Sequence, residues 1–237
     1  MRMQIRLALA SVVLACLAGY AGAQTVSINF GADEPNGAGS TVDGVAGAIG
    51  TANWNNVTGA SGSATNLIDA NGVATGVSVE WSSPNTWSSA GRGEENNTAT
   101  GEDFDLMTGY VDTGGLGGQG VVINVAGLNS AISDPAYDVI VYINGGVNGR
   151  GGDYEIGGVT QSLTGQLPFE GTYTEGEDYV RFRNLTGDAF TLNTIPNDGT
   201  PARAPVNGIE IIGVPEPSSI ALIFGGLLSL GMIRRKR

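Results

Sequence analysis

The sequence has no histidine, and its only cysteine, Cys16, and its only lysine, Lys236, lie near its two ends. Without histidine, the chain cannot build a Ser-His-Asp triad, a Cys-His pair or a histidine-ligated zinc site. A single cysteine cannot form an internal disulfide, so the fold must depend on its apolar core. These absences exclude most esterase, protease and metallohydrolase mechanisms, and also a site based on lysine.

Basic residues are scarce. Only 11 residues are basic, and four of them occupy positions 234–237. Between Gln24 and Val214 there are 22 acidic residues against five arginines, a formal charge of −17. Such a surface repels nucleic acid and anionic membranes. We therefore expect no nucleic-acid partner.

Helical periodicity is also missing between residues 24 and 214. Glycine (39) and proline (nine) make up about a fifth of the chain, less than the roughly 25–30% typical of low-complexity disorder. The apolar runs are short and rich in β-branched and aromatic residues, which is typical of strands. The predicted strands are Val26–Phe30, Gly76–Ser82, Phe104–Tyr110, Gly120–Leu128, Tyr137–Asn144, Tyr154–Ile156, Val159–Leu163, Tyr179–Leu185, Ala189–Leu192 and Ile209–Val214. This spacing predicts one all-β domain, residues 24–213, built as an antiparallel two-sheet β-sandwich, most simply a jelly roll.

Two of these runs predict how their strands are buried. In "GVSVEWSS", Val77, Val79 and Trp81 alternate with polar residues, which indicates one wet face. "YDVIVYIN" at Tyr137–Asn144 is apolar on both alternating sets after its aspartate, which predicts a central strand covered on both sides. Asn-Gly pairs at Asn36, Asn71, Asn144, Asn148 and Asn207 indicate tight turns with positive φ. Two polar segments, Ser82–Gly101 and Asn193–Asn207, are predicted to be exposed loops.

The first 23 residues have the pattern of a signal peptide. Two arginines precede an apolar run from Leu7 to Leu17, and Ala21-Gly22-Ala23 matches the small-x-small cleavage site. The mature chain is then predicted to start at Gln24. Alternatively, Val13–Cys16 is a lipoprotein box and Cys16 is acylated.

The last residues, "VPEPSSIALIFGGLLSLGMIRRKR", have three parts. Prolines on both sides of Glu216 keep that stretch extended and accessible. Ile220–Ile233 is an uncharged run of 14 residues, shorter than the about 20 residues of a relaxed membrane span. The basic end then acts as a cytoplasmic stop. The residues of the motif and of the stop are Pro215, Glu216 and Pro217, and Arg234, Arg235, Lys236 and Arg237. The alternative, a buried core helix, fits neither the prolines nor the four terminal charges.

Residues 214–237 therefore resemble the PEP-CTERM sorting signal, with "VPEP", a Gly-containing transmembrane segment and "RRKR" in order. The resemblance implies a precursor held in the inner membrane and recognised by an exosortase, a membrane transpeptidase. It also implies cleavage near the motif, followed by release or transfer to the cell surface or the extracellular space.

The body of the chain resembles a group of uncharacterised PEP-CTERM proteins. The resemblance is carried by "SINFG", "ANWNN", "LMTGYVD", "YDVIVYINGG", "YVRFRNLTGDAFTL" and "VNGIEIIG". It implies a galactose-binding-like jelly roll and transfers no activity. The closing strand after an Asn-Gly turn is also similar to that of malectin-like carbohydrate-binding sandwiches, but such fold analogy does not fix a function.

Carboxylates are the remaining candidates for catalysis. Glycoside hydrolysis needs only an acid and a base or nucleophile about 5–10 Å apart. The candidates are Glu94, Glu95, Glu102, Asp103 and Asp105. The alternative is a solvated acidic loop, which we favour because the whole body is acidic.

No cofactor is expected, although backbone carbonyls with Asp33 or Glu34 would suit a structural calcium ion. No segment has the spacing of a calcium-binding motif, so the metal ligands stay unassigned. Among the tryptophans, Trp81 is predicted to lie in the core and Trp54 to anchor a turn. Trp87, in the polar loop, either stacks on a sugar ring or packs beneath that loop.

Together these features lead us to expect an exported, non-enzymatic protein of the cell surface or extracellular polysaccharide matrix. Its role would be structural or adhesive, with weak carbohydrate binding. The alternative is a glycoside hydrolase that uses paired carboxylates.

Overall fold

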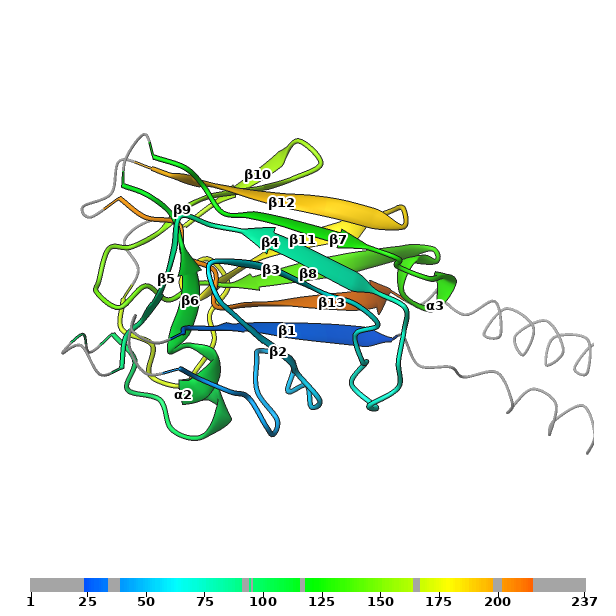
Figure 1. Cartoon of the computed structure of the whole chain (residues 1–237), viewed down its shortest axis with the longest axis horizontal. Coiled ribbons are helices and arrows are strands. Elements are labelled where there is room, and N and C mark those ends of the chain that lie inside the picture. Colours follow the sequence, from blue (N-terminus) through cyan, green and yellow to red (C-terminus); the bar gives the residue numbers. More distant parts are fainter. Residues whose placement is uncertain are drawn as a thin grey trace, which may run out of the picture.

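The computed structural model describes residues 24–33, 39–90, 94, 96–115, 118–163, 167–197 and 202–214. Within these residues the chain is an all-β sandwich of two packed sheets (Figure 1). The strands of the first sheet, in the order β11-β8-β13-β1-β2, are Tyr179–Leu185, Ala136–Tyr142, Gly208–Val214, Thr25–Gly31 and Asn55–Thr58. Those of the second sheet, in the order β10-β9-β12-β7-β4-β3, are Val159–Ser162, Gly152–Ile156, Ala189–Pro196, Val122–Ala126, Ser78–Ser82 and Ser61–Ala64. Neighbouring strands run antiparallel, except for the parallel pair β1 and β2.

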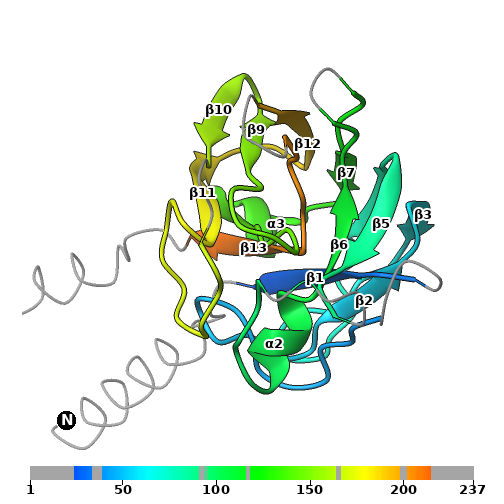
Figure 2. The same ribbon diagram turned by 90° about the vertical axis from the view of Figure 1, so that its left-hand side faces the viewer.

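A separate two-stranded ribbon, β5 (Asn85–Ser88) with β6 (Gly109–Asp112), lies at one end of the sandwich. Figure 2 looks onto this end. Two short helices, α2 (Glu102–Leu106) and α3 (Ser130–Ser133), complete the described elements. Residues 1–23 and 215–237, with their predicted signal and transmembrane helices, lie outside the described residues. Within the residues that are described, no helix has the length and apolar content needed to span a membrane.

The main core lies between the two sheets. The alternation of apolar and polar residues in the sequence explains which side chains enter it. On β4, Val79 and Trp81 face inward while Ser78, Glu80 and Ser82 face outward, as predicted. All seven residues of β8 are buried, which confirms that it is a central strand covered on both sides. Its second cover is an apolar cluster on the outer face of the first sheet, formed by Val42, Ala46, Trp54, Ala99, Leu106, Met107, Ile140, Tyr142 and Phe169.

The prediction for Phe104–Tyr110 was wrong, because this run divides into α2 and β6. The acidic residues in the first turn of α2 favour a helix at this position. Glu102 Oε2 accepts hydrogen bonds from the backbone N–H groups of Asp43 (2.7 Å) and Gly44 (2.9 Å). Acidic groups in a first helical turn also interact favourably with the helix dipole.

Both predicted loops contain strand residues. The segment from Ser82 to Gly101 includes β5, and β12 continues to Pro196. Strands β2 and β3 were not predicted, since they are short and polar.

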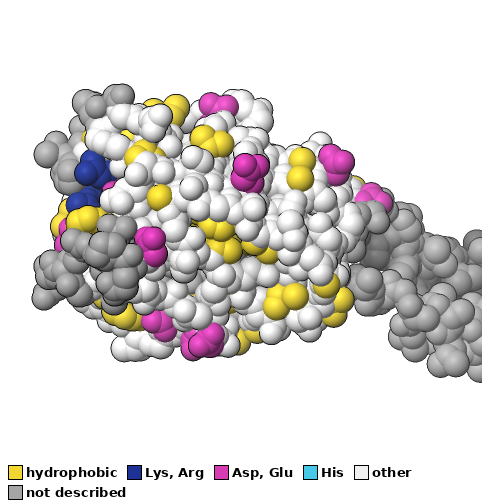
Figure 3. Space-filling model, in the orientation of Figure 1, with side chains coloured by type: hydrophobic (Ala, Val, Ile, Leu, Met, Phe, Trp, Pro, Cys, Tyr) yellow, Lys and Arg dark blue, Asp and Glu magenta, His cyan; other side chains and the backbone are white. Residues whose placement is uncertain are grey.

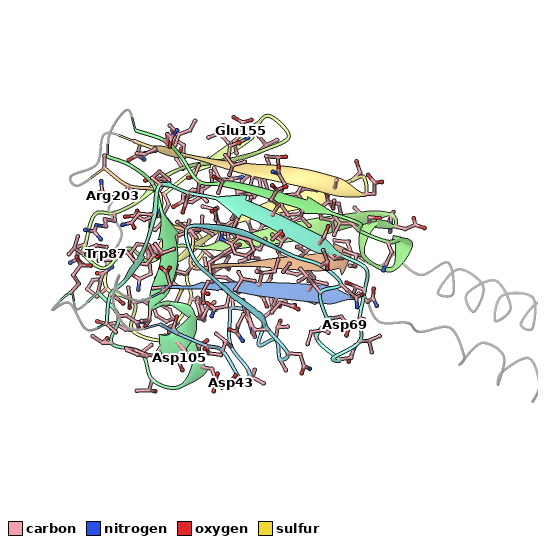
Figure 4. All side chains as sticks on the ribbon, in the orientation of Figure 1. Asp43, Asp69, Trp87, Asp105, Glu155 and Arg203 are labelled. Carbon is pink, nitrogen blue, oxygen red and sulfur yellow. The ribbon has the colours of Figure 1, made fainter. Side chains whose placement is uncertain are left out.

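The two ends of the described chain meet at one end of the sandwich (Figure 1). Thr25 pairs with Ile212 in the sheet, and the Gly213 N–H donates to the Gln24 carbonyl at 2.9 Å. Trp87 lies at the opposite end (Figure 4). The long axis of the strands therefore separates the chain ends from the β5–β6 ribbon.

Candidate functional site

Trp87 lies on β5 rather than in a loop, and it pairs in register with Tyr110 of β6. Its indole is partly buried, and the indole N–H donates to Glu94 Oε2 at 3.1 Å. The same carboxylate oxygen lies 3.5 Å from Arg150 Nη1, and the two side chains are only 17% and 13% exposed. Trp87 is thus one member of a polar cluster at the end of the sandwich, which we call the Trp87 cluster: Trp87, Glu94, Asn96, Tyr110, Asp112, Asn144, Arg150 and Arg203.

Tyr110 is fully buried at the centre of this cluster. Its hydroxyl accepts hydrogen bonds from Arg150 Nη1 (2.8 Å) and from the Gly146 N–H (3.2 Å). Burial raises the pKa of Tyr110 well above its ordinary value, although the nearby Arg150 acts in the opposite direction. The hydroxyl is therefore neutral at physiological pH and orients the guanidinium without competing for its charge.

Two glycines make room for the ion pair. A Cβ on Gly146 would lie 1.7 Å from Glu94 Oε2, and a Cβ on Gly145 would lie 2.8 Å from Arg150 Cβ. Any larger residue would force these side chains to move. The "NGG" that follows β8 is therefore the local sequence feature that lets Glu94 and Arg150 meet.

Buried asparagines attach the ribbon to the sheets. Asn96 Nδ2 donates to Asn144 Oδ1 (2.6 Å), and Asn144 Nδ2 donates to the Met107 carbonyl (2.9 Å). Asn207 Nδ2 donates to the Gly109 carbonyl at 3.0 Å. Asn144 and Asn207 belong to Asn-Gly pairs that were predicted as positive-φ turns, yet both are fully buried hydrogen-bonding residues.

The remaining Asn-Gly pairs behave differently. At Asn71-Gly72 and Asn148-Gly149 the glycine takes the predicted positive φ. Asn36 lies outside the described residues. The Asn-Gly pairs therefore have two different roles in this fold.

A second ion pair lies beside the first. Arg203 Nε is 3.2 Å from Asp112 Oδ2. Burial raises the pKa of Asp112 to about 6, while Arg203 and then Arg150 lower it by a smaller amount. Figure 3 shows dark blue basic atoms only at this end of the visible face, the end where Figure 4 labels Arg203.

Three buried polar atoms of the Trp87 cluster have no hydrogen-bond partner in the described structure: Asn96 Oδ1, Asp112 Oδ1 and Arg150 Nε. Leaving such an atom unsatisfied costs about 1–3 kcal/mol. Buried water or a ligand normally supplies the missing partner. The cluster therefore has unused hydrogen-bonding capacity at the end of the sandwich.

The carboxylates considered for glycoside hydrolysis do not form one group. Glu94 belongs to the Trp87 cluster, while Glu102 and Asp103 hold the segment 43–47. Asp103 Oδ1 accepts from the Gly47 N–H and from the Tyr173 hydroxyl, both at 2.9 Å. Asp105 has a raised pKa because of burial and the neighbouring Glu102 and Asp43. Glu95 lies outside the described residues.

A buried carboxylate that was not predicted lies beneath the same segment. Glu210 of β13 is fully buried, and it accepts hydrogen bonds from Ser27 Oγ (3.2 Å), the Tyr142 hydroxyl and the Thr51 side chain. Burial raises the pKa of Glu210. The Tyr142 hydroxyl also accepts from the Ala48 N–H at 2.7 Å, so this group links the 42–51 segment to the sheet.

A metal site is not assembled by the described residues. They contain no group of three or more His, Cys, Asp or Glu side chains placed to hold an ion. Asp33, one of the residues considered for calcium, accepts a hydrogen bond from Thr86 Oγ1. Glu34 lies outside the described part of the chain.

No protein-family model, no curated protein and no solved structure matches this chain. The site must therefore be interpreted from its geometry. Sequence reasoning named Trp87 and Glu94 but missed Tyr110, Asn96 and Arg150, which contact them or each other. The sequence signal that could have revealed this site is Gly145-Gly146, shortly after the strongly apolar strand β8. A glycine pair at such a position allows neighbouring side chains to lie against the backbone.

Proposed function

We propose that this chain is an exported protein sorted by an exosortase to the cell surface or the extracellular matrix. It would act there as a non-enzymatic structural or adhesive component with a galactose-binding-like jelly roll. The observation that carries the proposal is the sequence of residues 214–237, with its Pro-Glu-Pro motif, short apolar run and four terminal basic residues. The signal-peptide pattern of residues 1–23 supports the same export route.

The placement of the chain ends supports an outward-facing binding end. Gln24 and Val214 lie at the same end of the sandwich, and the Trp87 cluster lies at the other (Figures 1 and 4). A chain attached through either end would hold the Trp87 cluster away from the membrane. This arrangement suits a surface protein that contacts extracellular polysaccharide.

The chemistry of the Trp87 cluster favours a neutral glycan. An indole, a carboxylate, a guanidinium and amides provide one apolar ring and both donors and acceptors. Glu94 and Asp112 balance Arg150 and Arg203, so the cluster has no net formal charge within a body of strongly negative charge. A sugar with many hydroxyl groups fits such a cluster better than an anion.

A glycoside hydrolase remains the alternative, but no observation among the described residues favours it. Glu102 and Asp103 have backbone and tyrosine partners that account for their placement. Glu94 is held by Trp87 and Arg150. Each of these carboxylates therefore has a structural role that needs no catalysis.

Mass spectrometry of the protein recovered from the producing cells and their medium tests the sorting proposal. We expect a C-terminus close to Pro215–Pro217 and an N-terminus at Gln24. Secreted protein that still ends at Arg237 would refute sorting. A lipid-modified Cys16 would replace the predicted N-terminus without affecting the C-terminal result.

Binding of the mature protein to the producer's own polysaccharide tests the second part. We expect weak retention that Trp87→Ala removes and Trp87→Phe reduces, because phenylalanine keeps a ring but loses the N–H that Glu94 accepts. Trp81→Phe is the matched control, since Trp81 lies in the main core. Equal binding by the wild type and Trp87→Ala would contradict the assignment of this end.

A further inference from the structure

A notch interrupts the wall of the sandwich where β9 ends before β12. Strand β12 pairs with β7 from Ala189 to Asn193, but it pairs with β9 only from Leu192 to Pro196. Residues 189–191 therefore have a described neighbouring strand on only one side. The result is an open hollow of about 290 Å³ between the β9–β10 turn and the β11–β12 turn.

The floor of the notch is apolar and aromatic. Tyr137 and Phe190 line it, with ring centroids 6.0 Å apart and planes inclined by 32°. Ile156 adds an aliphatic surface. Phe190 is 8% exposed, so part of the edge of the main core reaches the notch.

The mouth of the notch is open because two glycines form one wall. Gly157 and Gly158 both have positive φ, and a Cβ at either position would meet no atom within 4 Å. Positive φ strains residues that carry a side chain, so glycine is favoured at both positions. The wall is therefore backbone, and a ligand can approach without displacing a side chain.

The rim offers a carboxylate and an amide as direct neighbours. Glu155 and Asn193 are opposite each other in the β9–β12 register, which places their Cβ atoms about 5 Å apart. Within the described structure neither side chain has a hydrogen-bond partner, and both are only partly exposed. Glu155 is labelled in Figure 4, far from Trp87.

These features select a ligand class. Adjacent acceptor and donor groups above an apolar floor suit two neighbouring hydroxyls and a C–H face of a sugar ring. The carboxylate on the rim and the negative body disfavour an anionic ligand. A hollow of about 290 Å³ is just below the roughly 300–1,000 Å³ range of ligand sites, which favours one ring over a long chain.

We propose that the notch between the β9–β10 and β11–β12 turns binds a single neutral sugar unit, separately from the Trp87 cluster. It rests on the proposed function only in taking extracellular polysaccharide as the source of that unit. Two sites on one sandwich would allow one molecule to contact two chains of a polysaccharide. Linking two weak sites in this way increases the overall affinity without new contacts.

The chain offers matched variants for a test. Ala189 lines the notch, and its exposed cross-strand partner Ala126 does not, so Ala189→Trp fills the hollow while Ala126→Trp adds the same bulk beside it. Glu155→Gln keeps the shape of the rim and removes its charge. Glu80→Gln is its control on the same outer face, at β4.

The measurement is protein-observed NMR of the mature chain titrated with free glucose, galactose, mannose and N-acetylglucosamine, with glucuronate as the anionic comparison. We expect at least one neutral sugar to shift the amide signals of Gly157, Gly158, Thr191 and Asn193, with a Kd in the range of about 1–100 mM. Ala189→Trp should weaken binding by about tenfold or more, and Glu155→Gln by about three- to tenfold. Ala126→Trp and Glu80→Gln should leave it unchanged.

The proposal would be overturned if no neutral sugar shifts these signals, if glucuronate binds there as well as the neutral sugars, or if Ala126→Trp weakens binding as much as Ala189→Trp. Because Glu155→Gln changes only a surface group, it remains informative if Ala189→Trp does not fold. Polysaccharide retention that is lost in Trp87→Ala and kept in both Ala189→Trp and Glu155→Gln would refute the notch and leave the proposed function intact.

Discussion

Asp112→Asn is predicted to make the protein more stable at neutral pH, although it removes one partner of an ion pair. The Asp112 side chain is only 7% exposed, and its Oδ1 has no hydrogen-bond partner in the described structure. Burial raises its pKa from 3.8 to about 6, a difference that corresponds to about 3 kcal/mol. The fold therefore favours the neutral form of Asp112 over the charged form more than water does, even beside Arg203.

The direction of the pH effect follows from this shift. Between about pH 4 and pH 6, Asp112 is protonated to a greater extent in the folded protein than in the unfolded chain. The contribution of this group to stability is then fully present below pH 4, and it is lost as the pH rises through about 6. An asparagine resembles the protonated acid at every pH. Relative to the wild type, the free energy of unfolding of Asp112→Asn should therefore be higher by up to about 3 kcal/mol at pH 7 to 8 and almost unchanged at pH 4.

Urea unfolding of the wild type and Asp112→Asn at several pH values from 4 to 8 provides the test, with the m-value compared to confirm that the same transition is measured. Arg203→Gln supplies a second arm. Without the nearest positive charge the pKa of Asp112 should rise further, which moves the loss of stability to higher pH. An Asp112→Asn variant that is less stable than the wild type at pH 8 would refute the reasoning, because the charged aspartate would then be net stabilising.

Two further predictions concern the residues around the buried groups. Gly146→Ala should lower the free energy of unfolding by about 1–3 kcal/mol, because its methyl group displaces the Glu94 carboxylate. This loss should be smaller in a Glu94→Ala background, which a double-mutant cycle by urea unfolding measures. Full additivity of the two changes would contradict the prediction. Tyr142→Phe should lower the free energy of unfolding by about 2–4 kcal/mol at neutral pH, because Glu210 and the Ala48 N–H each lose a buried partner. Thermal unfolding measures this loss. A variant as stable as the wild type would contradict the prediction and show that water replaces the hydroxyl.

The sequence predicts the strands of this fold well where burial sets the pattern. Val79 and Trp81 alternate with polar residues because only one face of β4 is covered, and β8 is apolar throughout because both of its faces are. Strands β2 and β3 have no such apolar pattern, since every residue in them is partly buried or exposed. Strand β2 pairs with β1, and β3 pairs with β4. Their positions therefore depend on partners that lie elsewhere in the chain.

The candidate sites were harder to predict, because their members come from separate elements. Arg150 and Glu94 meet only where β5, β6 and the segment after β8 converge, and no local pattern records that contact. The same holds for the notch, which exists because β9 is shorter than β12. A difference in length between neighbouring strands depends on how the strands pair. The sequence of either strand alone therefore cannot predict it.

The shared position of Gln24 and Val214 also determines how the sandwich responds to force. Strand β13 lies between β8 and β1, with seven paired positions to the first and five to the second. A pull between Val214 and a ligand at the Trp87 end acts along the strands, so the perpendicular backbone hydrogen bonds of both ladders are loaded together. A pull between Gln24 and Val214 acts at one end of the β1–β13 pair and opens it one position at a time. We therefore expect β13 to resist a pull between Val214 and the Trp87 end better than a pull between Gln24 and Val214.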